Sequence, residues 1–123
     1  MKISSFVLVV VLGVLTALHA SDAPSDAQAE STKLLNAISG GDYAAFIADG
    51  SDAFKGITKT QFDAVVAQLS TEMKAGYEAT YLGDLNQKGY QVTLWRLRFS
   101  SGGDDLLATL SLKGGKVGGY WIK

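Results

Sequence analysis

The chain has 123 residues, which is enough for one domain. Its formal net charge is −1 and its basic residues are interleaved with acidic ones, so we expect no nucleic acid as a partner. Cysteine is absent and the single histidine is His19. Disulfides, thiolate metal sites and cysteine nucleophiles are therefore excluded. Once His19 is removed, triads and common zinc sites are excluded too.

The N-terminus is predicted to be an export signal. Met1-Lys2 gives a positive start, an apolar run follows from Phe6 to Leu18, and small residues lead to Ala20. This order is typical of a secretory signal peptide, with cleavage expected after Ala20. The alternative is an uncleaved anchor, but the run is shorter than the roughly 20 residues that cross a bilayer comfortably. We therefore predict an exported protein, periplasmic or extracellular, with no membrane segment after cleavage.

Helical signals fill the first half of the remaining chain. A polar leader over residues 21–26 precedes the predicted domain, residues 27–123. A first helix is predicted from Asp26 to Ser39, ended by Gly40-Gly41. Asp42 can cap a second, from Tyr43 to Ala48. A loop with one helical turn around Phe54 is expected to follow.

The third helix carries the clearest signal. Thr58 and Gln61 stand in capping-box spacing, and apolar residues follow at helical intervals until Gly76. From Tyr77 onward the apolar period changes to two, which predicts strands separated by glycine-bearing turns. The four strands expected are Tyr77–Gly83, Gly89–Ser100, Asp104–Lys113 and Lys116–Ile122. Helices followed by an antiparallel meander predict an α+β fold, with three helices packed on a curved four-stranded sheet.

Two-residue turns at Ser101-Gly102 and Gly114-Gly115 would set the register of the last three strands. Arg98 would then lie opposite Asp105, and Leu110 opposite Gly119. The helix-facing side would hold Trp95, Leu97, Phe99, Leu106, Ala108, Leu110, Leu112, Val117 and Trp121. The outer side would hold Tyr90, Val92, Leu94, Arg96, Arg98, Asp105, Leu107, Thr109, Tyr120 and Ile122.

The outer side is unusually apolar for a monomer, which favours a homodimer through this face. The predicted interface residues are Tyr90, Val92, Leu94, Leu107, Tyr120 and Ile122. The alternative is a strongly curved sheet that its own loops partly cover.

Two stretches resemble the nuclear transport factor 2-like superfamily, which includes ketosteroid-isomerase-like and SnoaL-like proteins. They are Ala37–Phe46, where a helix ends at Gly-Asp-Tyr and a short one begins, and the strand-rich runs Gly89–Phe99 and Gly115–Ile122. The second stretch resembles the closing strands of small secreted bacterial members. The resemblance implies a cone of helices and curved sheet that usually encloses a pocket. It does not imply one function, because the fold hosts enzymes and plain binding modules.

The predicted ligand-binding residues lie on the helix-facing side of the sheet. Trp95 and Trp121 either line a pocket or fill the core, and Thr93, Gln91 and Glu78 would supply the polar groups of such a pocket. The alternative for Glu78, which depends on the register of the first hairpin, is an outward-facing position beside other surface charges.

A catalytic function would require acid–base residues in addition to such a pocket. An isomerase-like reaction requires a carboxylate base in an apolar cavity and a tyrosine donor, for which Glu78 and one of Tyr43, Tyr77 or Tyr81 are candidates. No motif identifies catalytic residues, and none is assigned.

Other charged or glycine-rich segments have simpler interpretations. Arg96 and Arg98 could hold an anion, but an Arg98–Asp105 cross-strand pair accounts for the latter. Asp84, Asp104 and Asp105 match no calcium loop, and Gly114–Gly119 lacks the spacing of a phosphate loop. We expect no metal and no cofactor. The leading hypothesis is an exported, non-catalytic domain that binds a small apolar ligand or a partner. The alternatives are a cofactor-free isomerase, cyclase or dehydratase, and a structural module with a filled core.

Overall fold

The described part of the protein is an α+β domain. A computed structural model describes residues 22–123, and the predicted signal peptide lies outside the described residues. The helices are α2 (Ser25–Gly40), α3 (Tyr43–Ile47), α4 (Asp52–Lys55) and α5 (Lys59–Ala75). The strands are β2 (Tyr77–Gln87), β3 (Tyr90–Phe99), β4 (Leu106–Lys113) and β5 (Lys116–Ile122), which form one antiparallel sheet in the order β2-β3-β4-β5. The predicted fold class is confirmed, with the expected turn around Phe54 present as the short helix α4.

Local sequence signals set the helix ends as predicted. Gly41 takes a left-handed conformation with φ of 68° and ends α2. The Asp42 side chain accepts a hydrogen bond from the Ala45 amide and so caps α3. Thr58 and Gln61 form a capping box at the start of α5.

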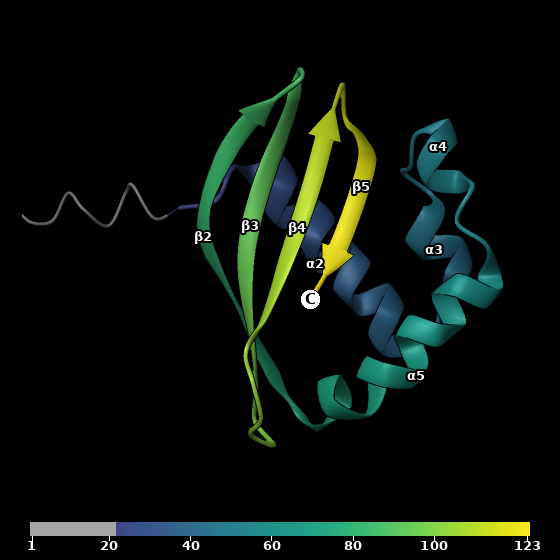
Figure 1. Ribbon diagram of the computed structural model, residues 1–123, viewed down its shortest axis with the longest axis vertical. Coiled ribbons are helices and arrows are strands. Elements are labelled where there is room, and N and C mark those ends of the chain that lie inside the picture. Colours follow the sequence, from purple (N-terminus) through teal and green to yellow (C-terminus); the bar gives the residue numbers. More distant parts are fainter. Residues whose placement is uncertain (1–21) are drawn as a thin grey trace, which may run out of the picture.

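The helices and the sheet share one core. Helix α2 lies behind the sheet, whereas α3, α4 and α5 lie beyond its β5 edge (Figure 1). Side chains from α2, α3, α4 and α5 pack with the inner face of β3, β4 and β5 around fully buried Leu34, Phe62, Trp95 and Leu110. Within residues 22–123, no helix is both long and apolar enough to cross a membrane.

The predicted register between β3 and β4 is confirmed. Leu97 pairs with Leu106, and Trp95 pairs with Ala108. Just beyond these pairs, the Arg98 guanidinium donates two hydrogen bonds, of 3.0 and 2.8 Å, to the Asp105 carboxylate. This pair is the expected cross-strand ion pair.

The predicted register between β4 and β5 is wrong beyond the first two pairs. Leu112 pairs with Val117, but Ser111 pairs with Gly119, so Gly118 is an extra residue in β5. This bulge moves every later side chain of β5 to the opposite face of the sheet.

The bulge corrects three predicted positions. Trp121, expected on the helix-facing side, lies on the outer side and is 58% exposed. Tyr120 and Ile122, expected on the outer side in a dimer interface, pair with Leu110 and Ala108 and pack against the core.

Strand β2 is longer than predicted and also carries an irregularity. It runs to Gln87 rather than to Gly83, and its register shifts between Tyr81 and Gly83. The turn into β3 is therefore Lys88-Gly89, shorter than expected. Glu78 pairs with Arg98 and is exposed, which settles the open alternative in favour of the outer face.

Candidate binding sites

Trp95 belongs to the solid core. Its side chain is 1% exposed, and its indole Nε1–H donates a 3.0 Å hydrogen bond to the Thr93 hydroxyl. That hydroxyl in turn donates to the Leu110 carbonyl at 3.5 Å. The polar atoms of Trp95 and Thr93 are thus used inside the protein rather than offered to a pocket.

The five predicted ligand-binding residues do not form one site. Trp95 and Thr93 are buried beneath the helices, and Gln91 lies half-buried farther along the same face. Trp121 and Glu78 lie on the outer face, on strands at opposite edges of the sheet. Trp95 and Trp121 were predicted to share the helix-facing side, and they do not, because the bulge at Gly118 reverses the end of β5.

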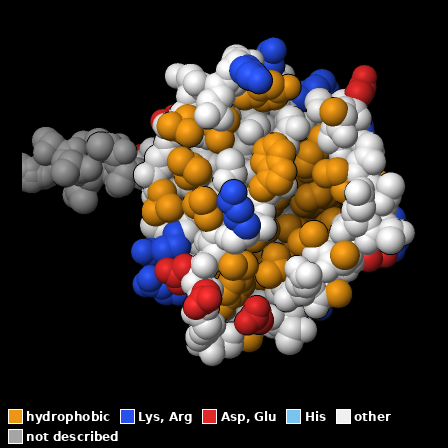
Figure 2. All heavy atoms as spheres, in the orientation of Figure 1, with side chains coloured by type: hydrophobic (Ala, Val, Ile, Leu, Met, Phe, Trp, Pro, Cys, Tyr) orange, Lys and Arg blue, Asp and Glu red, His pale blue; other side chains and the backbone are white. Residues whose placement is uncertain are grey.

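A pocket of about 230 Å³ lies between the helices and the sheet instead. Helices α2, α3 and α5 and the ends of β4 and β5 contribute its walls. It is lined by Ile38, Phe46, Val65, Gln68, Leu69, Leu106, Tyr120, Ile122 and Lys123. In Figure 2, hydrophobic side chains gather around a hollow beside the sheet. Most of the lining is apolar, and none of these side chains carries a carboxyl group.

Tyr120 is the unusual residue of this helix–sheet pocket. Its hydroxyl is buried and has no hydrogen-bond partner, although the Ser31 hydroxyl lies close to it. Burial raises the pKa of Tyr120, so the side chain stays a neutral phenol.

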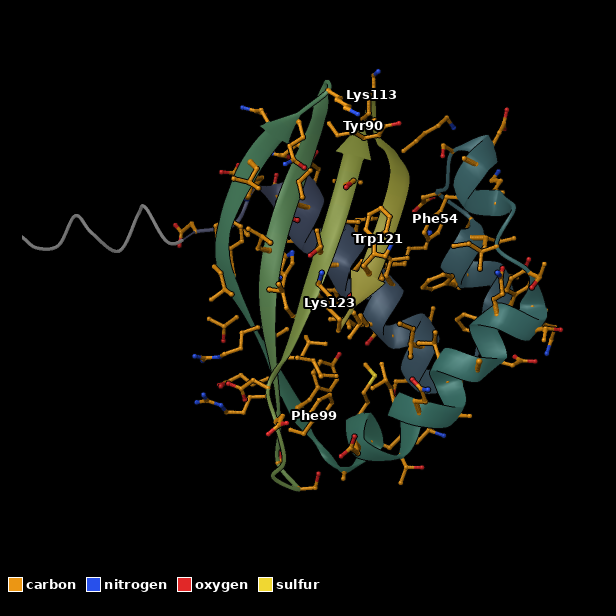
Figure 3. All side chains as sticks on the ribbon, viewed as in Figure 1. Phe54, Tyr90, Phe99, Lys113, Trp121 and Lys123 are labelled. Atoms are coloured by element: carbon orange, nitrogen blue, oxygen red, sulfur yellow. The ribbon has the colours of Figure 1, made fainter. Side chains whose placement is uncertain are left out.

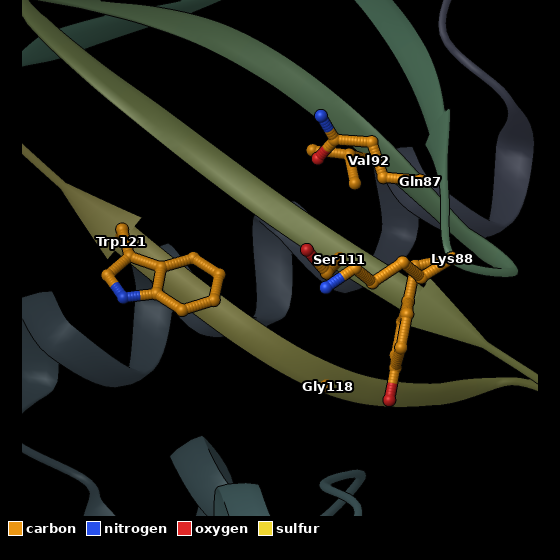
Figure 4. A pocket seen from close by; sticks show the side chains of 7 residues that line it. Gln87, Lys88, Val92, Ser111, Gly118 and Trp121 are labelled. Carbon is orange, nitrogen blue, oxygen red and sulfur yellow. The ribbon is translucent and has the colours of Figure 1, made fainter.

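A second hollow lies on the outer face of the sheet, near the β2–β3 turn. This outer groove has a volume of about 600 Å³ and is lined by Gln87, Lys88, Tyr90, Val92, Ser111, Gly118 and Trp121 (Figure 4). Its floor comes from β3, β4 and β5, and Gln87 and Lys88 stand at its rim. The lining contains two aromatic rings and no carboxylate.

Two glycines of β5 make room for these rings. A Cβ atom added at Gly119 would collide with the indole of Trp121, and one added at Gly118 would collide with the ring of Tyr90. The Trp121 indole therefore lies over the backbone of its own strand. Figure 3 shows Trp121 over β5 and Tyr90 at the end of the sheet beside Lys113.

The surroundings of the outer groove are cationic. The Lys113 ammonium lies over the Tyr90 ring, 5.3 Å from its centre, and Lys88 lines the groove itself. Neither lysine belongs to an ion pair among the described residues, where the three ion pairs involve Lys33, Lys59 and Arg98.

Two of the tyrosines considered as catalytic donors have partners other than Glu78. Tyr43 donates its hydroxyl hydrogen bond to the Ile57 carbonyl, and Tyr81 packs on Trp95 with ring centres 5.3 Å apart. Burial raises the pKa of both Tyr77 and Tyr81. Glu78 is exposed on the outer face beside Arg98, so it does not form the apolar acid–base site that an isomerase needs.

A carboxyl pair joins α2 to the segment before α4. Burial and the neighbouring Asp49 raise the pKa of Glu30 to about 7, against a smaller opposing effect of Lys33. Lys33 donates a 2.8 Å hydrogen bond to Asp49, and this bond lowers the pKa of Asp49. In residues 22–123, no three His, Asp or Glu side chains gather as a metal site.

Most residues of both hollows were not predicted from the sequence. The pocket residues of the helices, such as Phe46, Val65 and Leu69, have apolar periodicity that predicts only burial. For the outer groove a signal was present, since Gly118-Gly119 inside a strand with two flanking aromatics indicates a close approach to the backbone. Gln87 and Lys88 were expected in the turn and carried no further signal.

Comparisons with known proteins bear only on architecture. No protein-family model matches the sequence, and no curated protein matches it. Among solved structures, the chain is similar to an uncharacterized cystatin-fold protein from Novosphingobium aromaticivorans. The two share 12% identity with a TM-score of 0.42, over 82% of this chain and 99% of the other.

Proposed function

We propose that this protein is an exported, non-catalytic domain of the nuclear transport factor 2-like type that binds a small apolar ligand. The helix–sheet pocket is the observation that carries the proposal. It opens between α5, α3 and the β5 edge, where a cone of helices and curved sheet would hold a ligand. The order of the elements, with helices first and a meander last, supports the same architecture.

The pocket fits a compact ligand. Its volume of about 230 Å³ exceeds the roughly 150 Å³ of an apolar cavity that can take up benzene. Apolar walls would supply the binding free energy. A one-ring or two-ring aromatic compound satisfies this requirement.

The lining favours binding over catalysis. The isomerase, cyclase or dehydratase alternative requires an ionisable base, and the only charged residue of the pocket is Lys123 at its rim. The structural-module alternative draws support from the tightly packed core around Trp95. That alternative accounts for the core but leaves the pocket unexplained.

Native mass spectrometry of the protein exported through its own N-terminus tests the proposal first. The denatured mass should correspond to cleavage after Ala20, and the native mass should include a ligand that is lost on denaturation. If the exported protein carries no ligand, soaking with indole should raise its melting temperature. An unchanged melting temperature at millimolar indole, together with a bare native mass, would contradict ligand binding.

Two neighbouring valines of α5 provide a matched pair of variants. Val65 lines the pocket, whereas Val66 is equally half-buried but packs near Gly41 at the end of α2. The Val65→Phe variant should fill the pocket and weaken indole binding at least tenfold. The Val66→Phe variant should leave the affinity unchanged. Equal effects of both would assign the loss to general repacking of α5 rather than to the pocket.

Self-association through the outer face stays a prediction, with a smaller interface than the sequence suggested. Tyr90, Val92, Leu94 and Leu107 remain on that face, whereas Tyr120 and Ile122 do not. Light scattering at tens of micromolar protein tests it, since a monomeric mass at that concentration would contradict the dimer.

A further inference from the structure

We propose that the outer groove is a second binding site, which takes an acidic saccharide. A sugar ring would stack on the Trp121 indole, and its carboxylate would meet Lys88 and Lys113. This site lies on the opposite face of the sheet from the helix–sheet pocket, and neither proposal depends on the other.

The Trp121 side chain forms an open aromatic platform. Its indole lies over Gly119, where no Cβ atom could be accommodated, and 58% of the side chain is exposed. An exposed tryptophan held against its own backbone presents a broad apolar surface at a small cost in conformational entropy. The C–H face of a pyranose ring is flat and apolar and matches such a surface.

The groove around this platform combines apolar and polar groups. The Gln87 amide and the Lys88 ammonium stand at the rim, and the Ser111 hydroxyl lies in the floor beside Val92. A purely apolar ligand would make no use of these hydrogen-bonding groups. A saccharide has one apolar face, which can stack on the Trp121 indole, and a periphery of hydroxyls, which can form hydrogen bonds with the groups at the rim.

The charge of the site selects an acidic ligand. Lys88 lines the groove, Lys113 lies over the Tyr90 ring, and no lining residue carries a compensating carboxylate. Lys88 lies in the turn between β2 and β3, and Lys113 is the last residue of β4. The two chain segments are neighbours, since the Lys113 ammonium would lie 3.5 Å from a Cβ atom added at Gly89. An anion between them would find two cations without displacing an existing ion pair.

The volume agrees with this class of ligand. About 600 Å³ falls within the roughly 300–1,000 Å³ that small-molecule sites occupy. We therefore expect the groove to hold a short stretch of an acidic oligosaccharide rather than a single small anion.

Isothermal titration with tetragalacturonate tests the proposal, with maltotetraose as the neutral comparison. The protein should bind tetragalacturonate at least tenfold more tightly than maltotetraose. The Trp121→Ala variant should lose at least tenfold in affinity for tetragalacturonate. The Lys88→Gln/Lys113→Gln variant should lose at least fivefold, and added salt should weaken binding by the wild-type protein.

Two control variants separate the site from general effects on the surface. Leu82→Ala removes another exposed apolar side chain, from β2, and Lys74→Gln removes an exposed lysine, from α5. Both should bind tetragalacturonate like the wild type. Circular dichroism should show all four variants folded.

Four results would overturn the proposal. They are no binding at millimolar tetragalacturonate, equal binding of maltotetraose, unchanged affinity in Trp121→Ala, and a dimer that Trp121→Ala dissociates. The last result would identify the groove as part of an interface between two copies of the chain.

Discussion

At the scale of single residues, the two glycines of β5 decide what the outer face presents. Gly118 provides the extra residue of the bulge, and both glycines leave space that aromatic rings occupy. Trp121 is exposed for this reason, whereas the register expected without a bulge would have buried it. The outer groove therefore depends on the absence of side chains at Gly118 and Gly119 as well as on the rings of Tyr90 and Trp121.

Gly119→Ala should displace the Trp121 indole from the sheet. The added methyl group collides with the far end of the indole, which can swing into solvent, so the free energy of unfolding should fall by only about 1 kcal/mol. Iodide quenching of tryptophan fluorescence should increase. Gly40→Ala, where an added Cβ atom meets nothing within 4 Å, is the control and should leave quenching unchanged. Unchanged quenching in Gly119→Ala would contradict the position assigned to the indole.

At the scale of elements, the Glu30–Asp49–Lys33 cluster connects α2 to the segment that precedes α4. That segment also reaches β5, because the Val117 amide donates to the Asp49 carbonyl at 2.9 Å and the Ser51 amide donates to the Val117 carbonyl at 2.9 Å. The cluster therefore lies where the helices and the last strand are held together.

Ionisation of Glu30 should weaken the connection between α2 and the segment before α4 as pH rises. Its pKa of about 7 in the folded protein exceeds its usual 4.5, so the folded state holds a proton that the unfolded state has already lost. The contribution to stability is complete below about pH 4.5 and is lost as pH rises through 7. Because Glu30 is partly hydrated, we expect a loss of about 1 kcal/mol.

Urea unfolding of the wild type and Glu30→Gln between pH 5 and 8 measures this effect. The difference in unfolding free energy should shift in favour of the variant as pH rises. Glu72→Gln, which removes an exposed carboxyl group from α5, controls for the lost charge. A difference between wild type and Glu30→Gln that stays constant with pH would remove Glu30 from this role.

The elements also show which features the sequence could predict. Helix caps at Asp42 and Thr58 depend on residues three positions apart, and such local signals were read correctly. The Arg98–Asp105 pair followed from one hairpin register. The bulge at Gly118 could not be read, because a residue without a side chain gives no indication of which face it belongs to, and one extra residue reverses Tyr120, Trp121 and Ile122.

At the scale of the whole molecule, nearly all buried apolar side chains of residues 22–123 form a single cluster that draws on α2, α3, α4 and α5 and on β3, β4 and β5. Neither the helices nor the sheet has a separate core. We expect one cooperative unfolding transition, with coincident curves from far-UV circular dichroism and from Trp95 fluorescence in a Trp121→Phe background. Two separated transitions would contradict a shared core.

The same contacts between Ser51, Asp49 and Val117 bear on how the protein is made. Strand β5 is synthesised after the other described elements, yet it holds the helical half in place and carries the far wall of its pocket. A nascent chain that lacks β5 exposes apolar helix faces with nothing to cover them. We therefore expect the domain to stay unfolded until β5 has been synthesised.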